Sequence, residues 1–151
     1  MKFEQTIDLP GVNPGRVWDF VMDVPSMAKC IPGCSGVEDL GDNHYKATVK
    51  IKVGPIGLTL ASDISIVEKN EADRTASLLV EAADKRVGGA VKATMAMKLT
   101  PEGDGSKLEV TTDANVMGRI GDFGQPIIRK KADQTLHEVA DNLRKALATP
   151  A

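Results

Sequence analysis

The sequence predicts an α+β fold in which a curved antiparallel sheet of seven strands wraps around a long C-terminal helix, with two short helices after the first strand. Three observations support this fold. Apolar and polar residues alternate through much of the middle of the chain, which is typical of strands with one buried face. Short segments rich in Gly, Pro and Asn separate these stretches. Toward the C-terminus the apolar spacing becomes helical, which gives a two-layer domain over residues 1–151.

The N-terminal part is expected to hold one strand and two short helices. Lys2–Leu9 alternates as a strand does. Asn13 followed by Pro14 is a typical helix start, because an Asn side chain caps free backbone N–H groups and proline has no N–H to leave unpaired. A second short helix is expected over residues 26–30, after which Ile31-Pro32-Gly33 turns the chain.

The middle of the chain is expected to form a meander of antiparallel strands. His44–Val53 has the clearest pattern, with apolar residues on one face and Lys or Thr on most of the other. Segments that alternate in a similar way follow at residues 58–66, 75–83, 91–99 and 108–116. Their short connections favour antiparallel neighbours in one sheet.

The last predicted element is a helix over residues 124–148. Its apolar stripe is formed by Ala132, Leu136, Val139, Ala140, Leu143 and Leu147. Phe123 and Ile127 fall outside this stripe, so we expect the helix to bend, or to face two environments, near Pro126. A long amphipathic helix laid on the concave face of a sheet is the helix-grip arrangement, which leaves room for a cavity between the two layers.

Composition excludes several classes of function. The formal net charge of −2 argues against a general nucleic-acid-binding protein, which needs a basic face. Apolar runs never exceed three residues, so no segment is expected to span a membrane. The N-terminus has no apolar secretory signal, so a cytoplasmic location is expected.

The sequence contains no recognised catalytic or metal-binding motif. Cys30 and Cys34 have a spacing unlike the usual redox and zinc pairs, and a reducing cytosol would keep them as thiols. His137 and Asp141 could supply two ligands on one helix face, but an exposed surface pair is the favoured interpretation. We therefore expect no catalytic residues, no metal and no covalent cofactor.

The inward strand positions instead favour a pocket for a hydrophobic ligand. They are almost all aliphatic or Met, and methionine can line a pliable pocket, although simple core filling is the commoner role. Tyr45 and Thr112 are the clear polar exceptions. The expected lining residues are Trp18, Met22, Met27, Ile31, Tyr45, Val49, Ile51, Leu58, Leu60, Ile64, Met95, Met97, Val116, Phe123 and Ile127.

A basic cluster of Arg129, Lys130 and Lys131 begins the last helix. A solvated helix face explains it, and contact with an acidic partner or with anionic lipid headgroups is the alternative.

Several motifs together resemble one known family. They are Cys30-Ile31-Pro32-Gly33-Cys34, Lys52-Val53-Gly54-Pro55-Ile56, Gly88-Gly89-Ala90 and the glycine-rich joint at residues 118–124. This pattern resembles the family of the carbon monoxide dehydrogenase protein CoxG, in the START-like and Bet v 1-like helix-grip superfamily. The resemblance implies an accessory protein for a molybdenum hydroxylase, which binds a quinone or similar isoprenoid lipid or recruits the enzyme to the inner face of the membrane.

Two other functions remain open on the same fold. One is an enzyme of the polyketide cyclase or aromatase type, with Tyr45 or a carboxylate in the cavity as acid or base. The other is a pure assembly factor that docks on the hydroxylase through the Ile31-Pro32-Gly33 loop and the basic cluster.

Overall fold

The computed structural model describes residues 1–148, so the last three residues of the predicted 1–151 domain lie outside the described part. Its strands are β1 (Lys2–Leu9), β2 (Cys34–Gly41), β3 (His44–Val53), β4 (Ile56–Asn70), β5 (Thr75–Asp84), β6 (Gly89–Glu102) and β7 (Gly105–Gly118). Its helices are α1 (Pro14–Met22), α2 (Val24–Ala28), the 3₁₀ helix η1 (Arg119–Phe123) and α3 (Gln125–Ala148).

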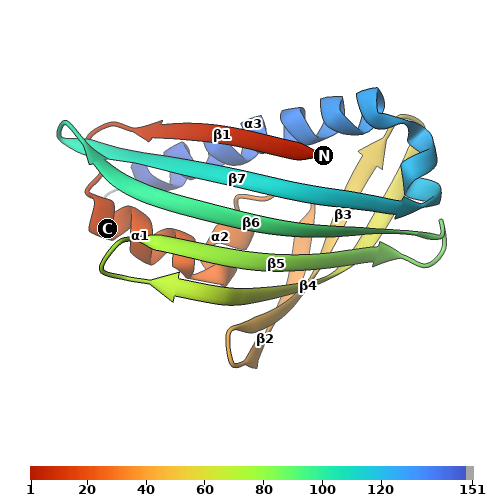
Figure 1. The fold of residues 1–151 in the computed structure, drawn as a ribbon, viewed down its shortest axis with the longest axis horizontal. Coiled ribbons are helices and arrows are strands. Elements are labelled where there is room, and N and C mark those ends of the chain that lie inside the picture. The colour runs from red at the N-terminus through yellow and green to blue at the C-terminus, as the bar shows by residue number, and fades with distance from the viewer. Residues whose placement is uncertain (149–151) are drawn as a thin grey trace.

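The seven strands form one antiparallel sheet in the order β1-β7-β6-β5-β4-β3-β2. In Figure 1, α3 (blue) runs behind the sheet, α1 and α2 lie at one end and η1 lies at the other. The predicted fold class is confirmed. The alternating pattern explains the sheet, because β3, β6 and β7 turn most of their apolar positions toward α3 and their charged positions toward solvent.

The short helices begin where their capping residues lie. The side chain of Asn13 accepts a hydrogen bond of 2.7 Å from the backbone N–H of Gly15, as the helix start at Pro14 predicts. Helix α2 covers Val24–Ala28, two residues earlier than the predicted 26–30. The shift has a simple reason: Pro25 fits the first turn of a helix, where its missing N–H has no partner to lose.

The joint between the sheet and α3 is ordered as a 3₁₀ helix. Ile120 in η1 is buried against Val53 and Leu58, so the joint is anchored to the sheet. The change of direction expected near Pro126 lies instead at Gly124, whose φ of +88° separates η1 from α3. Pro126 falls in the first turn of α3, a position that tolerates proline.

The main core lies at the α1 end of the molecule. Val17 and Trp18 of α1 pack there with Leu143 and Leu147 of α3, and all four side chains are buried. A second cluster surrounds Ile120 at the opposite end. A third, smaller cluster contains Phe3, Ala93 and Ala114 between the two.

Strand β1 is an edge strand whose open side is partly covered by α3. The main-chain bonds between Met1 and Ala114 show that odd-numbered residues of β1 pair with β7, so the carbonyls of Lys2 and Asp8 face the open edge. Arg129 donates to the Lys2 carbonyl at 3.3 Å, and Arg144 donates to the Asp8 carbonyl at 3.2 Å.

Candidate functional site

A hydrophobic cavity of about 130 Å³ lies between the concave face of the sheet, α3 and the two short helices. Strands β1, β4, β5, β6 and β7 form its floor, and residues of α1, α2 and α3 close it. The lining residues are Gln5, Ile7, Val21, Met22, Val24, Met27, Ile66, Leu78, Met95, Met97, Leu108, Val110, Leu136 and Val139.

Methionines give this cavity an adaptable wall. Met95 and Met97 come from β6, whereas Met22 and Met27 come from α1 and α2, so Met side chains line it from both layers. Met97, Met22 and Met27 pack on the main core and are only partly buried. Because methionine changes rotamer at low cost, this wall can adjust to ligands of different shape.

The cavity continues as incompletely covered apolar surface along the concave face. Inward-facing side chains of β3 to β7 beyond the cavity remain half-buried rather than fully buried: Val49, Ile51, Leu60, Ile64, Val80, Val91 and Val116. A tightly packed core would bury these side chains completely. Helix α3 therefore leaves the groove beyond the cavity only partly filled.

Gln5 is the one polar side chain among the described residues that line the cavity. It lies on the inward face of β1, between the buried Phe3 and Ile7. Its Nε2 donates a hydrogen bond of 3.0 Å to the backbone carbonyl of Leu136 in α3. Period-two alternation already places Gln5 on the inward face, and this signal could have identified it from the sequence.

The structure brings four of the sequence-predicted lining residues onto the cavity: Met22, Met27, Met95 and Met97. Trp18 is buried in the core beside it. Five others, Ile51, Leu58, Leu60, Val116 and Phe123, belong to the cluster around Ile120 at the far end of the groove. Ile31, Tyr45, Val49 and Ile64 are half-buried and do not line the cavity.

Ile127 is a correction to the predicted lining. Its side chain is 52% exposed, and it does not line the cavity. Ile127 precedes Leu136 by nine positions, which is about two and a half turns of an α-helix, so the two residues lie on opposite sides of α3.

The lining residues that sequence reasoning missed had recognisable signals. Leu108, Val110, Leu136 and Val139 all occupy apolar strand faces or the apolar stripe of α3. Periodicity gives the face of each residue, but it does not give the position along the groove at which α1 and α2 cover it.

Tyr45, the polar side chain that the sequence offered as an acid or base, does not line the cavity. Partial burial, with the carboxylates of Asp39 and Asp23 nearby, raises the pKa of its phenol above the ordinary value. The phenol therefore stays neutral at physiological pH and becomes a weaker acid.

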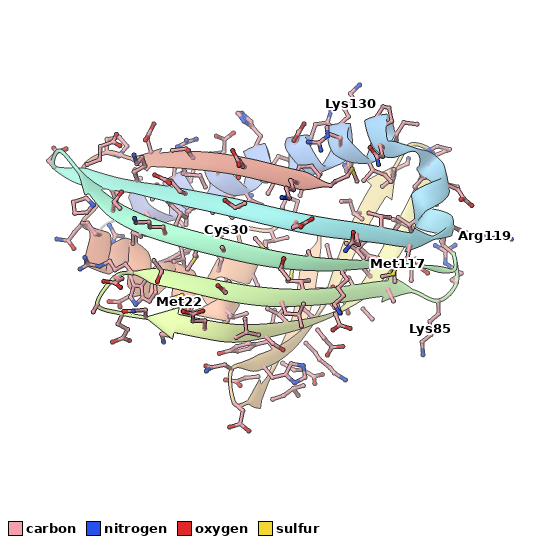
Figure 2. All side chains as sticks on the ribbon, viewed as in Figure 1. Met22, Cys30, Lys85, Met117, Arg119 and Lys130 are labelled. Atoms are coloured by element: carbon pink, nitrogen blue, oxygen red, sulfur yellow. The ribbon has the colours of Figure 1, made fainter. Side chains whose placement is uncertain are left out.

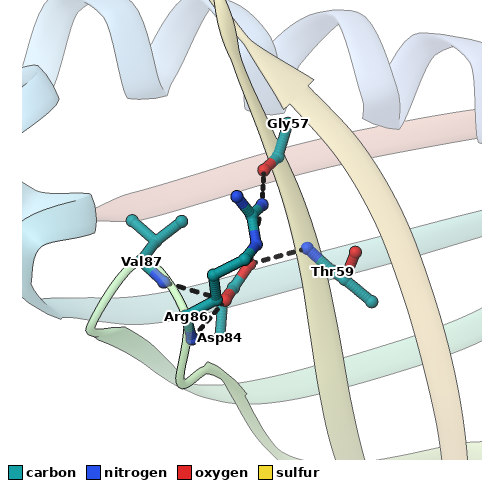
Figure 3. Close-up of polar contacts among 5 residues, drawn as sticks. All are labelled: Gly57, Thr59, Asp84, Arg86 and Val87. Carbon is teal, nitrogen blue, oxygen red and sulfur yellow. Dashed lines mark hydrogen bonds and ion pairs between the residues drawn. The ribbon is translucent and has the colours of Figure 1, made fainter.

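A buried carboxylate that the sequence did not reveal lies outside the cavity, at the end of β5 beside the β5–β6 turn. Asp84 accepts hydrogen bonds from the backbone N–H groups of Thr59 at 2.8 Å, Arg86 at 2.9 Å and Val87 at 3.0 Å (Figure 3). These hydrogen bonds hold the pKa of Asp84 below its usual value, and the bond from Thr59 has the largest effect. Arg86 in turn donates to the carbonyl of Gly57 at 2.7 Å, so this turn fastens β4 where β5 no longer pairs with it.

The two cysteines are free thiols in this fold. Cys30 is buried and Cys34 half-buried, neither forms a disulfide, and burial raises the pKa of both thiols. Within residues 1–148, no group of three His, Cys, Asp or Glu side chains could hold a metal ion. His137 is exposed on α3, with its Nε2 3.8 Å from a carboxylate oxygen of Asp141.

The predicted basic cluster is divided between two roles. Arg129 belongs to α3, and its side chain packs against β1. Its guanidinium lies 4.7 Å from the centre of the Phe3 ring and donates a hydrogen bond to the Lys2 carbonyl. Lys130 is exposed and points away from the sheet, as Figure 2 shows, and Lys131 is half-buried. In the described part of the chain, no helix is long and apolar enough to cross a membrane.

Comparison with known proteins identifies the family. The model of the carbon monoxide dehydrogenase CoxG family matches residues 11–148, nearly the whole chain. The chain belongs to the CoxG family. A search of curated proteins finds no match.

Solved structures show which folds this CoxG family member shares. A conserved protein from Geobacillus kaustophilus is 26% identical, with a TM-score of 0.88 over 98% of this chain and 95% of that one. An aromatase/cyclase from Streptomyces sp. R1128 is 14% identical, with a TM-score of 0.69 over 98% and 93%. A START superfamily protein from Mycobacterium smegmatis is 16% identical, with a TM-score of 0.67 over 97% and 97%. The last two likenesses concern the fold alone.

The segments that carry the family resemblance have structural roles here. Gly33 accepts a hydrogen bond of 3.0 Å at its carbonyl from the backbone N–H of Lys50, which joins the Ile31-Pro32-Gly33 loop to β3. Val53 is buried at the β3–β4 turn, against Ile120 of η1. Both segments thus contact β3 near its C-terminal end, at Lys50 and Val53.

Proposed function

We propose that this CoxG family member is a non-enzymatic accessory protein that carries a hydrophobic ligand, a quinone or similar isoprenoid lipid, for a molybdenum hydroxylase of the carbon monoxide dehydrogenase type. The observation that carries the proposal is the methionine-lined cavity under α3, with its half-buried apolar continuation. The family match supports the connection to carbon monoxide dehydrogenase.

The size of the cavity sets the kind of ligand. A cavity of about 150 Å³ holds a benzene ring, so the space of about 130 Å³ found here is close to the size that one small ring needs. A longer ligand must extend into the partly filled groove. Each CH₂ group that it buries contributes about 0.8 kcal/mol, so a hydrocarbon tail supplies most of the affinity. This gain must exceed the roughly 4–15 kcal/mol that association costs in lost translational and rotational freedom.

The chemistry of the lining favours binding over turnover. Among the described lining residues none is titratable, and the amide of Gln5 is neither an acid nor a base at ordinary pH. General acid–base catalysis needs a titratable group in reach of the substrate. The buried carboxylate of Asp84 is occupied by backbone N–H groups and lies outside the cavity.

A matched pair of strand substitutions tests ligand binding. Val110→Phe places a ring in the cavity wall, whereas Val67→Phe makes the same change at a valine that is 61% exposed on β4. Isothermal titration with decylubiquinone is expected to show at least a tenfold loss of affinity for Val110→Phe and less than a twofold change for Val67→Phe. No uptake of any quinone by the wild-type protein, or equal affinity in both variants, contradicts the proposal.

The hydroxylase contact has a separate test. In this proposal the protein works in the cytoplasm with peripheral contact at most with the membrane, and Lys130 and Lys131 meet the acidic partner. Lys130→Glu with Lys131→Glu should weaken co-purification with a recombinant carbon monoxide dehydrogenase, while Lys85→Glu at the exposed β5–β6 turn should not. Unchanged co-purification of the double variant argues against this contact.

A further inference from the structure

We propose that Gln5 is a specificity-determining residue that selects hydrophobic ligands carrying a hydrogen-bond donor, such as an aromatic ring with a hydroxyl or N–H group. This role rests on the proposed binding function and adds the chemistry of the ligand's polar group. Strand β1 turns Phe3, Gln5, Ile7 and Leu9 toward α3, and Gln5 alone among them is polar.

The hydrogen bonds around Gln5 leave its amide oxygen open. Nε2 donates to the Leu136 carbonyl, which fixes the orientation of the amide because a carbonyl accepts only from the nitrogen end. Within residues 1–148, Oε1 accepts no hydrogen bond, and no fully buried side-chain polar atom lacks a partner. Oε1 is therefore not fully buried, and because Gln5 is one of the residues that line the cavity, our inference places the donor of the ligand there.

The bond to Leu136 does not by itself account for a polar residue here. Leu136 lies inside α3, where helix geometry already pairs its carbonyl with the N–H of Ala140. Gln5 therefore gives Leu136 a second donor that the helix does not require. The bond does hold the Gln5 side chain in one orientation, which preorganises Oε1 for a ligand.

The ligand class follows from this open acceptor. A hydroxyl or N–H group can donate to Oε1, whereas a bare hydrocarbon leaves Oε1 without a partner once the ligand displaces water. A ligand whose only polar atom is an acceptor, such as a carbonyl or ether oxygen, cannot donate to Oε1, and its own oxygen would be repelled by Oε1. For a quinone carrier, this geometry favours the reduced quinol form, whose phenolic hydroxyl is a donor.

Three isosteric probes separate these possibilities: indole has an N–H donor, benzofuran has an acceptor oxygen, and indene has neither. Isothermal titration gives the ratio of indene to indole dissociation constants for the wild-type protein, for Gln5→Leu and for Gln5→Met. One hydrogen bond changes affinity by roughly 3- to 10-fold. We expect the ratio to fall by that factor in both variants, and benzofuran to bind no better than indene to the wild type.

Thr112→Val is the matched control. Thr112 faces the same side of the sheet on β7, next to Phe3, but does not line the cavity, so its loss should leave the ratio unchanged. Equal ratios in wild type and Gln5 variants, or a preference for benzofuran that depends on Gln5, overturn the inference while the binding function stands. Failure of all three probes and of the quinones to bind the wild type overturns the proposed function itself.

Discussion

Replacing Gly33 by alanine tests whether the loop between α2 and β2 is held against the sheet. Gly33 has a φ of +77°, and a Cβ added there would collide with the backbone carbonyl oxygen of Lys50 on β3. The same residue accepts the N–H of Lys50 at 3.0 Å, so the loop cannot move away without losing this bond.

The expected loss of stability is the sum of two contributions, from the backbone conformation of residue 33 and from its hydrogen bond to Lys50. A left-handed backbone conformation costs a non-glycine residue roughly 1–2 kcal/mol, and the lost hydrogen bond adds roughly 0.5–1.5 kcal/mol. Gly33→Ala is therefore expected to lower the free energy of unfolding by about 1.5–3.5 kcal/mol. Gly36 offers a control, because its φ is +62° but the space around its added Cβ is open. Gly36→Ala should therefore lose only the roughly 1–2 kcal/mol that the left-handed backbone conformation costs.

Urea unfolding followed by circular dichroism measures both variants, with the slope of the transition checked for two-state behaviour. The larger loss is expected for Gly33→Ala. Equal losses in the two variants refute the reasoning, because they would show that the loop relaxes from Lys50 without cost.

Other variants test the core, the buried carboxylate and the thiols. Leu143→Ala removes a fully buried side chain and should cost roughly 2–5 kcal/mol in urea unfolding, whereas Leu40→Ala, at a 46% exposed position, should cost much less. The pKa of Asp84 is lower in the folded protein than its unfolded value of 3.8, so the ionised carboxylate stabilises the fold at pH values above 3.8. This stability is lost as the pH falls from 3.8 through the folded pKa. Asp84→Asn should therefore have a lower melting temperature than the wild type at pH 7. When the pH falls below 3.8, the melting temperature of the variant should fall less than that of the wild type. Plots of melting temperature against pH that run parallel for the two proteins would contradict this prediction. Cys30 and Cys34 should react slowly with iodoacetamide at pH 7 and quickly in urea, and fast labelling of the folded protein would contradict their burial.

Sequence periodicity predicted most of the fold because most strands bury only one face. In β3, the buried Ala47 and Val53 lie on one face and the exposed Lys50 and Lys52 on the other, so period two is visible directly. Strand β2 was expected only as part of the strand count, because its sequence CSGVEDLG has no such alternation. It is an exposed edge strand with two register shifts, and edge strands need no apolar face.

The candidate site was less predictable, for a physical reason. Alternation tells which side of the sheet Met95 or Leu60 occupies, but the position of the cavity depends on where α1 and α2 cross the groove. Those crossings depend on contacts distant in sequence, such as Val17 with Leu143. Asp84 was missed for the same reason, since its partner Thr59 lies 25 residues away on another strand.

The two arginine contacts on β1 have a consequence for how this protein behaves at high concentration. An edge strand with free carbonyls can pair with the edge of another molecule and extend the sheet between copies. Here the carbonyls of Lys2 and Asp8, at both ends of β1, are already occupied by Arg129 and Arg144. The other edge, β2, is interrupted by its register shifts. Both edges are thus partly blocked for self-association, which makes the sheet around the partly filled hydrophobic interior a poorer template for aggregation.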